Sequence, residues 1–106
     1  MPQPYDFEAF LARMATLGSY ADIIIEANEA CASAERASSG RGGPRQRELG
    51  SLRYAHRIKE FLYFLQHGSR PGSATEQDFS SYRPVVEALV VKGHFKPEIL
   101  GLFRKG

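Results

Sequence analysis

The sequence predicts an all-α protein, a small helical bundle of four to five helices around a long antiparallel helix hairpin. Apolar residues recur every three or four positions along most of the chain, which is the spacing of one helix face. Glycine, proline and serine separate these periodic stretches, at points where helices end. Only residues 85–91 are rich enough in valine to suggest a strand, and a lone strand has nothing to pair with.

Length and composition indicate one globular unit. The chain has 106 residues, of which 42% are hydrophobic and 25% charged, as in ordinary globular proteins. We therefore expect residues 1–106 to fold as a single helical domain. No apolar run approaches the roughly 20 residues of a membrane span, and no signal-peptide pattern opens the chain. We expect a cytoplasmic protein that does not bind membranes.

The first predicted helix has one apolar face and ends at Gly18. The members of this face lie three or four positions apart: Phe7, Phe10, Leu11, Met14 and Leu17. A second helix begins after Ser19, a suitable N-cap with Asp22 three positions later, and runs to about Ala37. Its inward stripe starts with large residues and continues with small ones, which allow a neighbouring helix to approach closely. The stripe comprises Tyr20, Ile23, Ile24, Ala27, Ala30, Cys31, Ala34 and Ala37.

A flexible loop is predicted at about residues 38–47, which are rich in glycine and serine. The third helix spans about Gln46 to His67 and ends at Gly68. Its first half is amphipathic, with an inward stripe of Leu49, Leu52, Ala55 and Ile58. Residues 61–65 are apolar on every side, so this stretch is buried either in the core or against another subunit.

Short helices are predicted for the C-terminal third. Thr75 with Asp78, or Ser73 with Glu76, can cap a fourth helix. This helix breaks near residues 81–83 because Pro84 cannot continue it. A fresh helix starts at Pro84 and stops at Gly93. Pro97 then suits the first position of a last short helix.

Charge is distributed unevenly along the chain. Residues 1–35 carry six acids and one base, whereas residues 36–70 carry eight bases and two acids. One explanation is that the acidic second helix and the basic third helix attract each other when they pair. Such exposed pairs contribute only about 0–1 kcal/mol each, so they would guide register more than stability.

A basic strip for an anionic partner is the alternative explanation. Arginine binds phosphate through a planar fork of donors, and most of the bases between Arg41 and Lys59 are arginines. The strip would comprise Arg41, Arg45, Arg47, Arg53 and Arg57. It predicts a nucleic-acid-binding protein that contacts mainly phosphate and has little sequence specificity.

Catalytic and metal-binding signatures are weak. His56 and Glu60 lie one helical turn apart, and we expect an exposed i,i+4 pair. Cys31 lies among alanines, where a thiol is buried and inert. We expect no metal, no cofactor and no catalytic activity, although dispersed residues can also assemble an active site.

The leading functional hypothesis is a small helical protein-interaction module, an adaptor or regulatory subunit that forms a homodimer. Residues 61–65 offer more apolar surface than one facing helix can cover, and the C-terminal apolar group can dock on a partner. The expected partner interface comprises Phe61, Phe64, Leu65, Phe95, Leu102 and Phe103.

Overall fold

The computed structural model describes the backbone of residues 5–39 and 45–103, and the side chains of residues 5–36 and 50–103. These ranges contain helices and no strand, which confirms the predicted all-α class. The elements are α1 (Phe7–Leu17), α2 (Tyr20–Ser39), α3 (Arg45–His67), α4 (Glu76–Ser81), α5 (Arg83–Val91) and the 3₁₀ helix η1 (Pro97–Phe103).

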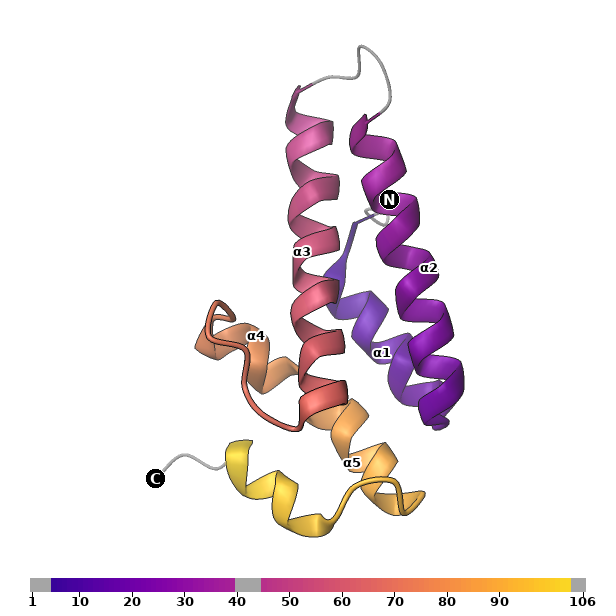
Figure 1. The fold of residues 1–106 in the computed structure, drawn as a ribbon, viewed down its shortest axis with the longest axis vertical. Coiled ribbons are helices and arrows are strands. Elements are labelled where there is room, and N and C mark those ends of the chain that lie inside the picture. The colour runs from indigo at the N-terminus through magenta and orange to yellow at the C-terminus, as the bar shows by residue number, and fades with distance from the viewer. Residues whose placement is uncertain (1–4, 40–44, 104–106) are drawn as a thin grey trace.

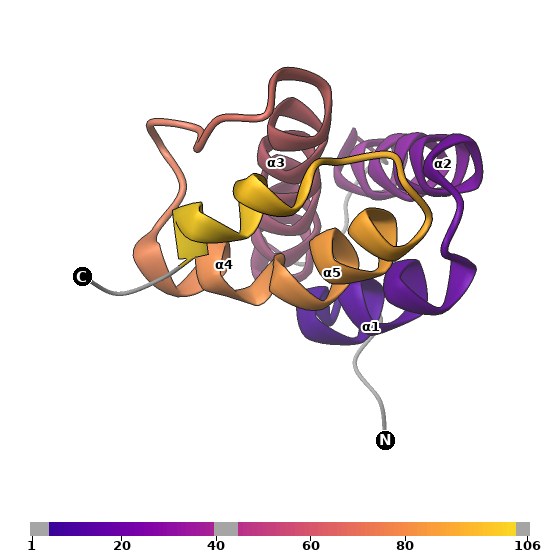
Figure 2. The ribbon, with the colours of Figure 1, turned by 90° about the horizontal axis from the view of Figure 1, so that it is seen from below.

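The antiparallel pair α2 and α3 forms the predicted hairpin and lies along the 47 Å long dimension of the molecule (Figure 1). Small side chains let the two helices approach closely: Ala27, Cys31 and Ala34 are all buried. The Cys31 thiol reaches the carbonyl oxygen of Ala55 at 3.6 Å. Seen from below, α1 and α5 lie on one side of the hairpin (Figure 2).

Local signals in the sequence set the helix ends as predicted. Gly18 ends α1 in a left-handed conformation (φ 63°), which glycine adopts without strain. The hydroxyl of Thr75 accepts a hydrogen bond from the Asp78 amide at 3.0 Å and caps α4. At Tyr82 the chain leaves α4, and α5 starts with Pro84 in its first turn.

Two boundaries differ from the sequence prediction. The predicted loop is too long, because α2 continues to Ser39 and α3 begins at Arg45; residues 40–44 lie outside the described residues. The final segment is a 3₁₀ helix, in which the Ile99 amide bonds to the carbonyl of Lys96, three residues earlier.

An aromatic cluster at the C-terminal end of α3 forms the centre of the core. Phe64 is fully buried, with ring centroids 5.3 Å from Phe79 and 5.8 Å from Phe103. Phe61 is also fully buried and meets Phe10 of α1 edge-on at 5.8 Å. The C-terminal elements thus fold back over the part of α3 that is apolar on every side.

Candidate functional site

Four of the six residues predicted for a partner interface lie inside the chain. Phe61 and Phe64 are 0% exposed, Leu65 is 3% and Phe103 is 9%. The prediction is therefore corrected for these four side chains. As expected, one facing helix cannot cover their apolar surface. Several elements of the same chain cover it instead: α1, α2, α4, α5 and η1.

The other two predicted interface residues keep some exposure. Phe95 is half-buried, with its ring 6.5 Å from that of Phe64. Leu102 on η1 is exposed. The C-terminal group thus serves mainly to cover the core, and Leu102 alone among the six stays on the surface.

A different surface of the hairpin carries exposed apolar side chains. We call it the outer face, the side of α2 and α3 turned away from α1 and α5 (Figure 2). No other element among residues 5–39 and 45–103 packs over it in the two views of the ribbon. On each helix its members follow the spacing of four, three and four positions that keeps residues on one side. Helix periodicity places them on the sides of α2 and α3 opposite Glu26 and Phe61, which contact Arg13 and Phe10 of α1. They are Ala21, Ile25, Asn28 and Ala32 on α2, and Leu52, His56, Lys59 and Tyr63 on α3.

Three large apolar residues project from the outer face: Ile25, Leu52 and Tyr63 are 55%, 49% and 46% exposed. Sequence reasoning placed Leu52 on the inward stripe, and the structure corrects this. Ser51 is 0% exposed and occupies the inward position instead. The spacing in the sequence could have indicated this: Leu52 and Tyr63 are eleven positions apart, about three helical turns, and therefore lie on the same face of the helix.

Ion pairs connect α2 to α1 and to α3. Lys59 on α3 pairs with Glu35 on α2 at 2.5 Å. Arg13 on α1 donates two hydrogen bonds of 2.9 Å each to the carboxylate of Glu26 on α2. The Lys59–Glu35 pair agrees with the expectation that the acidic second helix and the basic third helix attract each other. Together the two pairs connect α2 to both of its neighbours.

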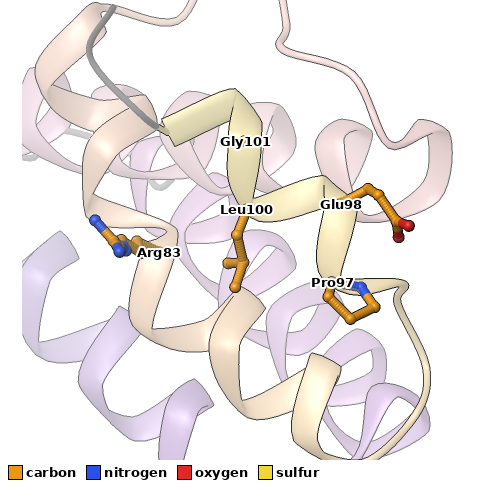
Figure 3. A pocket seen from close by; sticks show the side chains of 5 residues that line it. All are labelled: Arg83, Pro97, Glu98, Leu100 and Gly101. Carbon is orange, nitrogen blue, oxygen red and sulfur yellow. The ribbon is translucent and has the colours of Figure 1, made fainter.

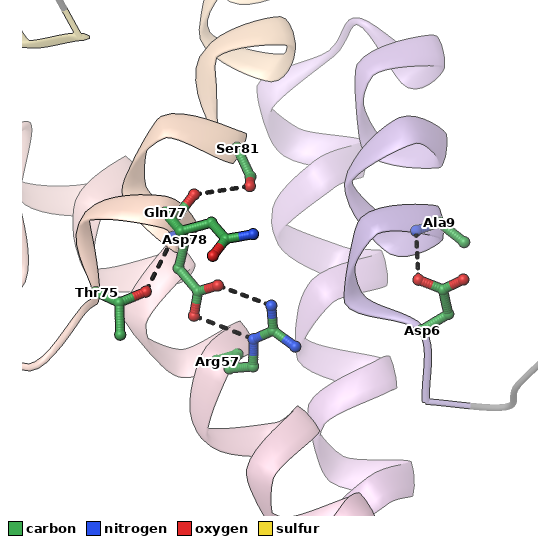
Figure 4. A network of polar contacts seen from close by, with 7 residues as sticks. All are labelled: Asp6, Ala9, Arg57, Thr75, Gln77, Asp78 and Ser81. Atoms are coloured by element: carbon green, nitrogen blue, oxygen red, sulfur yellow. Dashed lines mark hydrogen bonds and ion pairs between the residues drawn. The ribbon is translucent and has the colours of Figure 1, made fainter. Parts of the chain in front are cut away.

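The predicted arginine strip is not assembled among the described side chains. Arg57 points at α4, where it binds both carboxylate oxygens of Asp78 at 2.7 and 3.1 Å (Figure 4). Its guanidinium also lies 4.4 Å from the centre of the Phe7 ring. Arg53 is exposed. Arg41 and the side chains of Arg45 and Arg47 lie outside the described residues.

The His56–Glu60 pair is not the exposed pair that the spacing suggested. His56 Nε2 lies 3.1 Å from Glu60 Oε2, but the Glu60 side chain is only 6% exposed. The Ser73 hydroxyl donates to the same oxygen at 2.5 Å. This order differs from a nucleophilic relay, in which the imidazole lies between hydroxyl and carboxylate. The Glu60 carboxylate instead anchors the loop before α4 to α3.

The thiol of Cys31 is buried, as predicted, and burial raises its pKa. A raised pKa disfavours the reactive thiolate. Within the described part of the chain, no cluster of three or more histidine, cysteine or acidic side chains is placed to hold a metal ion.

Two pockets open on the surface away from the outer face. One, of about 420 Å³, lies between the start of α5 and η1 and is lined by Arg83, Pro97, Glu98, Leu100 and Gly101 (Figure 3). The guanidinium of Arg83 in this pocket is already paired with Glu87 at 3.0 Å. The other, of about 290 Å³, lies between α1 and the hairpin, beside the Arg13–Glu26 pair. Neither brings together a set of groups suited to a reaction.

Comparison with protein-family models, with curated proteins and with solved structures gives no match for this chain. None of the helices in the described ranges is long and apolar enough to cross a membrane.

Proposed function

We propose that this chain is a helical protein-interaction module that binds a protein partner through the outer face of the hairpin. One observation carries the proposal. Of the five large apolar side chains exposed in the described part of the chain, Ile25, Leu52 and Tyr63 share this face. Single exposed apolar residues are ordinary, whereas several on one uncovered face are typical of interaction sites.

The composition of the face also suits a protein partner. A tyrosine offers a large apolar ring and a polar hydroxyl, which makes it common at protein interfaces. Between Leu52 and Tyr63 on α3 lie His56 and Lys59, whose side chains are 63% and 58% exposed. The face thus mixes apolar and polar side chains, as interfaces between proteins that also exist apart do.

A photo-crosslinking amino acid placed at Tyr63 tests the proposal in cells that make the chain. The same amino acid at Val91, which is 84% exposed on α5, is the matched control. We expect a discrete crosslinked species from position 63 and none from position 91. Because the apolar residues act together, Ile25→Ser and Leu52→Ser should each weaken the crosslink at position 63.

Equal crosslinking from positions 63 and 91, or a crosslink at 63 that survives both serine substitutions, would contradict the proposal. The molar mass of the crosslinked species identifies whether the partner is another protein or a second copy. Both substitutions affect side chains that are about half exposed, so the fold should be retained and circular dichroism verifies this.

We do not extend the proposal to nucleic acid. Arg57 is engaged with Asp78 and Phe7, so using it for phosphate would require breaking contacts that hold α3 to α4 and α1. Oligonucleotide binding measured at low and moderate salt checks this alternative. Binding that falls steeply with salt and weakens in Arg53→Ala would support the basic strip after all.

A further inference from the structure

We infer that the occupant of the outer face is a second copy of this chain, related by a two-fold axis parallel to the hairpin. The inference rests on the proposed function and names its partner. The two copies form a four-helix bundle in which α2 of each lies over α3 of the other. Register, side-chain size and charge all favour this arrangement.

Contacts inside the hairpin fix which residues lie at the same level. The Tyr20 hydroxyl is 3.5 Å from the carbonyl of Leu65, and the Cys31 sulfur is 3.6 Å from the carbonyl of Ala55. Ile25 therefore lies about level with Phe61, two positions from Tyr63. Two positions are about 3 Å along a helix axis, less than the length of either side chain.

The same register holds at the other end of the face. Ala32 lies about level with Tyr54, again two positions from Leu52. An axis parallel to the helices exchanges α2 and α3 without changing level. It therefore brings Ile25 of one copy onto Tyr63 of the second copy, and Leu52 onto the small Ala32. Each contact occurs twice, as an isologous interface requires.

Charge distinguishes this axis from the alternative. Asp22 and Glu29 are exposed acids of α2, whereas Glu26 and Glu35 pair with Arg13 and Lys59 of the same chain. On α3, Arg53 is an exposed base beside the outer face. With the axis parallel to the hairpin, the acidic helix of each copy faces the basic helix of the other. An in-plane axis perpendicular to the hairpin would stack α2 on α2 and α3 on α3, like charge on like charge, which disfavours binding.

The area of the face is sufficient for a reversible dimer. The 20 residues of α2 span about 30 Å, and two adjacent helices are about 20 Å wide. The face therefore offers about 600 Å² per copy, or about 1,200 Å² in total, the lower end of specific interfaces. Association should accordingly depend on protein concentration.

Mixed disulfide crosslinking tests the geometry with the full chain. In a Cys31→Ala background, Ile25→Cys and Tyr63→Cys are made as separate proteins, mixed and oxidised gently. The arrangement predicts a crosslinked dimer in the mixture, about tenfold more than either protein forms alone, because only unlike positions are held together. The control pair, Ile25→Cys mixed with Val91→Cys, should give only the background amount.

The opposite pattern would overturn the inference. Crosslinks that form as well in each single-cysteine protein as in the mixture would indicate stacking of like helices, or random collision. No crosslink in any sample would exclude self-pairing. A cellular crosslink from position 63 to a different protein would then leave the proposed function standing, so the two failures are distinguishable.

Discussion

At the scale of single residues, Tyr82 is the least conventional feature of the core. Its side chain is 0% exposed, and its hydroxyl has no hydrogen-bond partner among the described residues. Burial raises the pKa of Tyr82 far above its ordinary value, and the carboxylates of Glu60 and Asp78 raise it further. A buried hydroxyl without a partner destabilises the fold, whereas its ring packs against Phe61 and Phe64 and stabilises it.

Tyr82→Phe should therefore leave stability at neutral pH unchanged or raise it by up to about 1 kcal/mol. Above pH 10 the unfolded tyrosine ionises while the buried one cannot, so wild-type stability falls as pH rises. The substitution should remove up to about 1.4 kcal/mol of this loss per pH unit. Urea unfolding between pH 7 and about pH 11 measures both effects. The control is Tyr63→Phe, which changes an exposed tyrosine. An equal pH dependence of stability in wild type and Tyr82→Phe would contradict the inference that the buried Tyr82 hydroxyl causes the loss.

The Arg57 side chain joins three elements, because it lies on α3 and contacts Asp78 of α4 and Phe7 of α1. It binds Asp78 through both carboxylate oxygens, and both side chains are largely buried. Arg57→Ala leaves the Asp78 carboxylate without this partner, so we expect a loss of about 2 kcal/mol in the free energy of unfolding. The exposed Arg83–Glu87 pair provides the control, and Arg83→Ala should cost less than about 0.5 kcal/mol. Urea unfolding should rank the two variants in this order. Equal losses would mean that the Arg57–Asp78 contact stabilises the fold no more than an exposed ion pair does.

Residue-level chemistry was predictable where it depends on neighbours in sequence. The Thr75 cap and the glycine end of α1 follow from a few adjacent positions. The burial of Glu60 was not predictable, because it depends on Ser73 in a loop 13 positions away. The same holds for Arg57, whose partner Asp78 is 21 positions away.

At the scale of elements, α3 presents two surfaces with different roles. Phe64 lies in the aromatic cluster, while its neighbour Tyr63 points outward. Sequence alone identified this segment as apolar on every side but could not decide what covers it. The answer depends on how α4, α5 and η1 fold back, which local periodicity does not contain. The assignment of Leu52 failed for a related reason: a one-position shift of the buried stripe, to Ser51, reverses which side chain faces the core.

The two surfaces should respond differently to truncation. Phe64→Ala opens a cavity in the centre of the core and should cost about 3–5 kcal/mol. Tyr63→Ala removes a half-exposed ring and should cost less than about 1 kcal/mol of monomer stability. Thermal unfolding at low protein concentration, where association is weak, gives both values. A large loss in Tyr63→Ala with a small one in Phe64→Ala would reverse the assignment of core and surface.

At the scale of the whole molecule, one part of the apolar surface is buried in the core and another part stays exposed on the hairpin. The aromatic end of α3 is covered internally by α1 and the C-terminal elements, and the outer face of the hairpin is left uncovered by the described elements. The helical class and the hairpin were predictable from periodicity and loop composition. The location of the proposed interaction face was not, because it depends on which side of the hairpin the remaining helices pack against.

Sedimentation equilibrium of the purified chain tests the central claim most directly. As concentration rises from about 1 μM to about 1 mM, the wild-type mass should increase from that of one 11.8 kDa chain toward that of two. Tyr63→Asp should remain monomeric over this range with an unchanged helix content, whereas Val91→Asp should associate like wild type. A wild-type chain that stays monomeric throughout, or association that Tyr63→Asp does not weaken, would contradict self-pairing through the outer face.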